Sequence, residues 1–205
     1  MKKLVVPIVV AFVLWFVMFS PQTSGLLNFW LAMSISAVVL TTLSFAIDGK
    51  EVRDSIRFSW KDLAIGVVSA AVLWGIFWVG NFVSTKIFDF ASGQIGSVYA
   101  MKDGENQTLI AILLLLLIGP AEEIFWHGFV QRNFSKKYGF LLTVGLTTLI
   151  YSVVHLPSLN FMLIMSAMVC GAFWGTLYYC NKNLLTTIVS HALWDCAVFI
   201  VFPIS

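Results

Sequence analysis

The chain has 205 residues, of which 60% are hydrophobic and only 11% are charged, and its mean hydropathy is +0.93. An ordinary soluble domain carries about 25% charged residues. So few charged side chains cannot cover a water-facing surface or neutralise nucleic-acid phosphates, which excludes a soluble enzyme, a disordered tail and a nucleic-acid binder. The composition predicts a protein embedded in a lipid bilayer.

Seven apolar runs follow one another along the chain. They cover residues 4–19, 26–47, 63–83, 109–134, 140–155, 159–179 and 184–203. A helix needs about 20 residues to cross a hydrocarbon core roughly 30 Å thick, so most runs are long enough and the first and fifth are short. The first run is long for a signal peptide and no small-residue cleavage motif follows it, so we interpret it as a helix. The predicted fold class is all-α, a polytopic bundle of about seven transmembrane helices.

Positive charges gather at alternate ends of these runs. With the N-terminus inside, ten of the twelve Lys and Arg residues lie on the cytoplasmic side, and only Lys86 and Lys102 lie outside. Short cytoplasmic loops collect Lys and Arg, so we expect this orientation. The short loops and compact chain are typical of a bacterial protein. We therefore expect a multi-pass protein of a bacterial inner or plasma membrane.

The chain is expected to form one structural domain with two functional parts. Residues 1–106 are predicted to be a scaffold of three spans and an outer interfacial segment at 84–106, which is either a connector or a lid. Residues 107–205 are predicted to hold four spans that carry the functional groups. The cysteines Cys170, Cys180 and Cys196 have neither an even count nor metal-ligand spacing, so we expect reduced thiols.

Ionisable side chains stand in or at the edge of the last four runs, where a charge costs at least about 2.5 to 3.5 kcal/mol. They are Glu122, Glu123, His127, His155, His191 and Asp195. The other seven carboxylates, among them Asp48, are expected in loops or at the ends of spans. Burying such groups separately would leave each without a partner, so we expect Glu122, His155, His191 and Asp195 to converge on one wet pocket. Adjacent residues on a helix point about 100° apart, so only one of the two glutamates can face it.

The spacing of these groups predicts their local geometry. Glu123 and His127 are four residues apart, as are His191 and Asp195, so each pair shares one helix face. The second pair suits either a metal site or a histidine whose tautomer is fixed by the aspartate. The Gly-Pro pair at 119–120 is expected to kink or restart the fourth helix, which would place the glutamates in the first turn of a new segment.

Three motifs stand in order along the chain. They are Glu122-Glu123-x-x-x-His127, Tyr151-x-x-x-His155 and His191-x-x-x-Asp195. This pattern resembles the CAAX-protease and bacteriocin-processing family (CPBP), whose motifs read Glu-Glu-x-x-x-Arg, Phe-x-x-x-His and His-x-x-x-Asn/Asp. The resemblance covers about residues 109–202. It implies an intramembrane endopeptidase similar to the type II CAAX prenyl proteases, acting on a membrane-associated peptide or protein.

The resemblance also implies which residues form the active centre. It implies a set of Glu122, His155, His191 and Asp195, with Glu123 beside them. His127 and Tyr151 would support this set. The chain departs from the family at both supporting positions. His127 replaces an arginine that is permanently charged, which makes its pairing with Glu123 conditional, whereas Tyr151 keeps the aromatic ring of the family's phenylalanine.

Two mechanisms fit these residues. In one, Glu122 and His155 activate a water molecule, and His191, oriented by Asp195, stabilises the oxyanion. In the other, His155 and His191 with a carboxylate hold Zn²⁺, and Glu122 transfers the proton.

Two other functions remain open. The departure at His127 favours a catalytically inactive relative that acts as a membrane-bound immunity or regulatory partner. A break in the fourth helix at residues 119–120 would also suit a transporter with a carboxylate and histidine relay.

Overall fold

The computed structural model describes residues 1–204. Over these residues the chain is helical and has no β-strand. Seven helical segments in this range are long and apolar enough to cross a membrane. The predicted all-α, seven-span bundle is therefore confirmed, and the protein is a multi-pass membrane protein.

The spanning segments differ in regularity. The regular ones are α1 (Lys2–Phe19), α3 (Trp60–Ile87) and α9 (Phe161–Asn181), whereas α2 (Phe29–Asp54) is kinked at Asp48. A fourth span, Gln107–Ser135, joins α5 (Gln107–Leu113), α6 (Gly119–Glu123) and α7 (Arg132–Ser135) through wider π-helical turns at Leu114–Ile118 and Ile124–Gln131. The remaining two spans are the fifth and the seventh. The fifth is α8 (Phe140–Val153), followed by a 3-10 turn at Leu156–Ser158, and the seventh is α10 (Leu184–Cys196), followed by a π-helical turn at Ala197–Val201.

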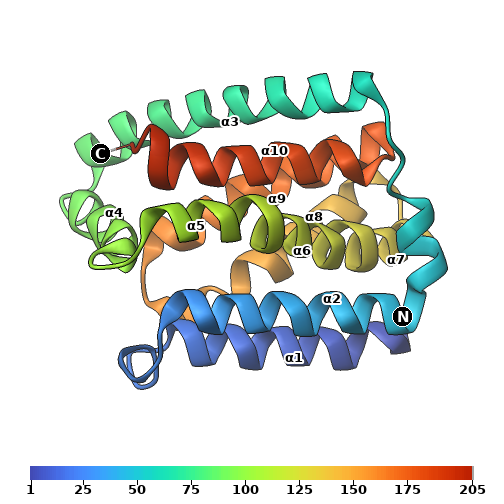
Figure 1. Cartoon of the computed structure of the whole chain (residues 1–205), viewed down its shortest axis with the longest axis horizontal. Helices are drawn as coiled ribbons and strands as arrows, with labels where there is room; N and C mark the ends of the chain where they lie inside the picture. The colour runs from blue at the N-terminus through green and yellow to red at the C-terminus, as the bar shows by residue number, and fades with distance from the viewer. Residues whose placement is uncertain (205) are drawn as a thin grey trace.

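The helices are arranged around the fourth and last spans. In Figure 1, α3 lies along α10, α1 lies along α2, and α5 to α7 run between these two pairs. The fourth and last spans are the most buried of the spans within residues 1–204, whereas α1 and α3 expose apolar side chains such as Val6 and Val68. The spans that carry most of the ionisable side chains are thus the centre of the bundle, and the outer helices face the lipid.

Small residues bring the central helices close together. A Cβ atom on Gly119 would lie 3.0 Å from the Ala192 Cα, so α6 and α10 approach almost backbone to backbone. A Cβ atom on Gly171 would lie 3.1 Å from a ring carbon of Tyr151, which places α9 equally close to α8. Helix contacts in membranes commonly use small residues in this way. These contacts set the distances between the polar side chains on the same helices.

The fourth span continues in helical geometry through Pro120. Gly119 has helical dihedrals (φ −55°, ψ −51°), and its N–H donates to the Leu114 carbonyl five residues earlier. A proline in a regular helix clashes with the carbonyl four residues before it, and a π turn just ahead of Pro120 widens the backbone at that point. The predicted break therefore takes the form of a change in hydrogen-bond pattern. The π turn ends at Ile118 and α6 begins at Gly119, with Pro120 near its start and Glu122 in its first turn, while the helical dihedrals continue.

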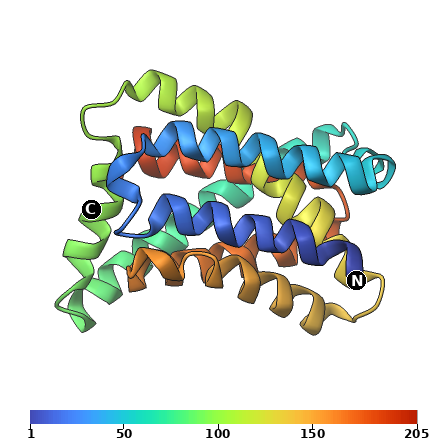
Figure 2. The same cartoon turned by 90° about the horizontal axis from the view of Figure 1, so that it is seen from below.

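A short helix, α4 (Ala91–Tyr99), crosses the end of the bundle that holds the C-terminus (Figure 2). This end is called the C-terminal end below, and the opposite end the N-terminal end. The Gln94 carbonyl accepts a hydrogen bond from Asn160 Nδ2 at 2.8 Å, and Gln94 Oε1 accepts one from the Met162 N–H at 3.0 Å. The outer segment predicted at 84–106 thus contains a helix that is bound to the start of α9.

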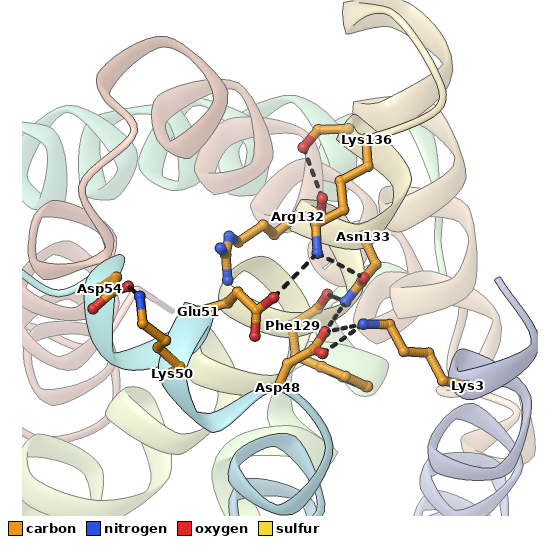
Figure 3. A network of polar contacts seen from close by, with 10 residues as sticks. Lys3, Asp48, Lys50, Glu51, Asp54, Phe129, Arg132, Asn133 and Lys136 are labelled. Carbon is orange, nitrogen blue, oxygen red and sulfur yellow. Dashed lines mark hydrogen bonds and ion pairs between the residues drawn. The ribbon is translucent and has the colours of Figure 1, made fainter.

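Asp48 lies in α2 at the N-terminal end of the bundle, which agrees with the expected position at the end of a span, and it is buried, with 5% of its surface exposed. The helix is locally distorted there, with φ −133° and ψ 35°. Lys3 Nζ lies 2.5 and 2.7 Å from the two carboxylate oxygens, and Asn133 Nδ2 donates to one of them at 2.7 Å (Figure 3). This cluster joins α1, α2 and the fourth span at the N-terminal end.

Candidate active site

A cavity of about 470 Å³ lies among the spans and extends to α4. Each of the seven spans contributes to its wall, and most of the lining is apolar or aromatic. Five of the predicted site residues line this cavity. They are Glu122, Tyr151, His155, His191 and Asp195. The structure thus brings together groups from three separate spans, as the sequence predicted.

Tyr151 contacts both Glu122 and His155. Its hydroxyl donates a hydrogen bond to Glu122 Oε2 at 2.9 Å, and its backbone carbonyl accepts one from His155 Nδ1 at 2.7 Å. The phenylalanine of the family motif could make only the second of these bonds. The substitution therefore adds a polar contact to Glu122, in addition to keeping the ring.

His155 has a defined tautomer because a carbonyl can only accept a hydrogen bond. Nδ1 must carry the proton that Tyr151 accepts, which leaves Nε2 with a lone pair in the neutral ring. Trp15 of α1 donates its indole N–H to this Nε2 at 3.1 Å, and the Trp15 side chain is fully buried. Sequence reasoning missed Trp15. It stands alone in an apolar run, 140 positions before its partner, and no pattern distinguishes it from a core residue.

His191 lies between two carboxylates. Its Nδ1 is 2.8 Å from Glu123 Oε1, and its Nε2 is 3.4 Å from Asp195 Oδ2. The Trp174 ring stacks on the imidazole, with centroids 3.7 Å apart and planes at 18°. The predicted pairing of His191 with Asp195 on one face is thus observed, and Glu123 and Trp174 fix the ring from two further sides.

Glu123 is outside the cavity lining and lies behind His191. Its Oε1 is 3.8 Å from His127 Nε2, so this predicted pair also shares one face. His127 Nδ1 lies 2.6 Å from Gln131 Oε1, and Gln131 Nε2 donates to the Gly175 carbonyl at 2.7 Å. Because that carbonyl must accept, the Gln131 oxygen faces His127 and accepts from its Nδ1–H. The sequence did not point to Gln131, which holds His127 in the position that an arginine takes in the family motif.

The donor arrangement around His155 and His191 differs from the predicted zinc site. Both ring nitrogens of His155 are engaged, by Tyr151 and by Trp15. Within residues 1–204, no three His, Cys, Asp or Glu side chains are grouped so that they could hold a metal ion. The residues as arranged do not fit a zinc ion held by His155 and His191, and the mechanism below uses no step through a metal.

Comparison with known proteins places this site in a family. Residues 104–197 match the family of type II CAAX prenyl endopeptidases described as Rce1-like. No curated protein matches the chain, and no solved structure does. The matched segment contains all three motifs, and it confirms the resemblance drawn from them.

Proposed function

Since residues 104–197 belong to the Rce1-like family of type II CAAX prenyl endopeptidases, we propose that the protein is an intramembrane endopeptidase. Its substrate would be a membrane-associated peptide or protein, in a bacterial inner or plasma membrane. The observation that carries the proposal is the gathering of Glu122, His155, His191 and Asp195 around one cavity. Ionisable groups inside a membrane bundle that face a common cavity are typical of a functional site.

The first step is activation of a water molecule by Glu122 and His155. Tyr151 occupies one carboxylate oxygen of Glu122, which leaves the other oxygen to accept a proton from water. The lone pair of His155 Nε2 is the second acceptor. In the arrangement observed, the Trp15 N–H binds this lone pair, so a water molecule takes its place only when the indole withdraws. The water oxygen then forms a bond to the carbonyl carbon of the peptide, and its proton passes to Glu122.

The second step stabilises the oxyanion and releases the products. His191 Nε2 is directed toward Asp195 in the cavity wall, where its N–H can donate to the carbonyl oxygen as negative charge develops. Glu123 holds the opposite nitrogen and fixes the orientation of the ring. The C–N bond then breaks, the carbonyl re-forms as a carboxylic acid, and Glu122 returns its proton to the leaving amine. The proton and electron counts balance without another reactant.

A cleavage assay tests the proposal. The full chain, purified in detergent, is incubated with a mixed peptide library, and the products are identified by mass spectrometry. We expect cleavage that disappears in Glu122→Gln and persists in Glu105→Gln. Glu105 is the matched control because it is exposed and contacts Asn28 outside the cavity. Equal cleavage by Glu122→Gln and the unsubstituted protein would refute the assignment of the base.

The second candidate is a catalytically inactive relative that binds a membrane partner. Two observations favour it. His127 replaces the arginine of the family motif, and Trp15 occupies the lone pair of His155. A folded protein that leaves the whole library intact would support this candidate, particularly if Trp15→Phe also gives no cleavage.

A further inference from the structure

A second cavity, of about 250 Å³, lies at the N-terminal end of the bundle. Its walls come from the segment after α2, the end of the fourth span and the end of α9. The first contributes Arg57, the second Arg132 and the third Lys182. Three cations from three separate parts of the chain therefore line one small cavity, which is distinct from the cavity of the candidate active site.

The cations in this cavity have few anionic partners. Asp54 is the one carboxylate in the wall, and it pairs with Lys50 at 2.9 Å. Arg132 is half-buried, and none of the hydrogen bonds or ion pairs found within residues 1–204 engages its guanidinium. Figure 3 shows its side chain directed away from the Lys3–Asp48 pair.

Hydrogen bonds to the backbone fix the positions of Arg57 and Lys182. Arg57 Nη2 donates to the Lys182 carbonyl at 3.2 Å, and Lys182 is in the left-handed conformation (φ 54°) that ends α9. Asn183 fixes the same connection, because its side chain bonds both the N–H and the carbonyl of Arg57, at 3.1 and 2.8 Å. Both residues therefore have fixed places in the cavity wall, and an anion bound in the cavity would be attracted by both charges.

The surroundings of the cavity match a membrane interface. Phe58 and Trp60, next to Arg57, are 70% and 77% exposed and contact each other edge to face. Exposed aromatic residues of this kind typically lie at the level of lipid headgroups. The charge pattern predicts that this end faces the cytoplasm, where the leaflet carries anionic lipids and where basic pockets between helices bind lipid phosphates.

The geometry points to a binding site for a phosphate group, that of an anionic phospholipid headgroup. The planar guanidinium of Arg132 offers two parallel donors to phosphate oxygens, and Lys182 adds a point charge. Tyr178 and Ser135 also line the cavity, and the Ser135 hydroxyl donates to the Arg132 carbonyl at 2.8 Å, which ties it to the same part of the wall. The site is independent of the proposed peptidase activity, because it shares no lining residue with the first cavity.

Native mass spectrometry of the full chain tests this site. The protein in detergent is titrated with phosphatidylglycerol or with phosphatidylcholine of the same acyl chains, and in a separate arm with inorganic phosphate. We expect phosphatidylglycerol to be retained in preference to phosphatidylcholine. The double variant Arg132→Gln/Lys182→Gln should lose roughly 30-fold in phosphatidylglycerol affinity, on the basis of roughly fivefold per basic residue.

A second double variant is the matched control. Lys61→Gln/Lys137→Gln removes the same charge from the same end of the molecule, outside the cavity lining, and should retain the affinity of the unsubstituted protein. Arg132→Lys should keep part of the affinity, because it preserves the charge without the planar fork. Binding of inorganic phosphate that is lost in the same variant would identify free phosphate as a ligand of the same site. Equal losses in the two double variants, or equal retention of the two lipids, would overturn the proposal.

Discussion

Two buried carboxylates in this protein have opposite surroundings. Asp48 is surrounded by Lys3 and Asn133, which bind its oxygens in a packed cluster. Glu122 has one hydrogen bond, from the Tyr151 hydroxyl, and faces a cavity. A carboxylate whose oxygens are all paired is held in one state, whereas one that faces an open space can accept a proton from a bound molecule. Burial alone therefore does not distinguish the two carboxylates, and their neighbours favour Glu122 as the proposed base.

The largest expected effect is on the rate of cleavage and concerns Glu122 and His155. Glu122→Gln should lower the cleavage rate by about 10³-fold, because a positioned base typically contributes 10² to 10⁴. The double variant Glu122→Gln/His155→Ala should cleave no more slowly than Glu122→Gln alone, because groups that activate the same water act as a unit. Initial rates on a peptide cleaved by the unsubstituted protein measure both. Losses that multiply in the double variant would assign the two residues to separate steps.

The next largest effect concerns Asp48 and is a change in the stability of the fold. Asp48→Ala should lower the free energy of unfolding by roughly 2 kcal/mol, because Lys3 and Asn133 lose a shared charged acceptor. Unfolding in mixed detergent micelles, followed by helical circular dichroism, measures it. Asp54→Ala is the control. It removes a carboxylate from an exposed pair with Lys50 and should leave unfolding unchanged. An unchanged free energy of unfolding in Asp48→Ala would contradict the structural role of Asp48, and with it the contrast with Glu122.

A smaller effect is expected at Trp15. Trp15→Phe keeps an aromatic ring and deletes the N–H that binds His155, so kcat should rise by roughly three- to tenfold, the equivalent of one hydrogen bond. Trp30→Phe is the matched control, since Trp30 also lines the cavity but donates its N–H to the Met101 carbonyl at 2.9 Å. A fall in kcat at Trp15 alone would instead mean that the indole supports His155 during the reaction.

The smallest effect is expected at His127. His127→Arg places a permanent cation beside Glu123, now 3.8 Å from the imidazole Nε2, and should raise kcat/KM less than tenfold, because it acts on His191 only through Glu123. His127→Gln, which removes the ionisable ring, should lower it. Equal kcat/KM in the two variants would show that Glu123 positions His191 without a cationic neighbour.

Local regularities in the sequence predicted most of the fold. Length and hydropathy located the seven spans, because each span must satisfy its own backbone hydrogen bonds within the bilayer. The four-residue spacing correctly paired His191 with Asp195, at 3.4 Å. At Pro120 the sequence predicted a kink or a restart, and the structure shows a change from π-helical to α-helical hydrogen bonding at Gly119. The π turn before Pro120 accommodates the ring, and propensity rules for regular helices do not include this alternative.

Contacts between distant segments could not be predicted. Trp15 reaches His155 across 140 positions, and Gln131 reaches Gly175 across 44. In both cases the partner is defined by helix packing, and a tryptophan or glutamine carries no spacing pattern that reveals it. The role of Asp48 was missed for the same reason, since its partners Lys3 and Asn133 come from two other helices.

The side chain of Gln131 has a consequence for experiments in native membranes. It lines the cationic cavity at one end of the bundle and also holds His127, which faces Glu123 and through it His191. Gln131, His127, Glu123 and His191 therefore form a chain of contacts between the walls of the two cavities. The lipid that remains bound to a preparation is thus a condition to hold constant when cleavage is assayed.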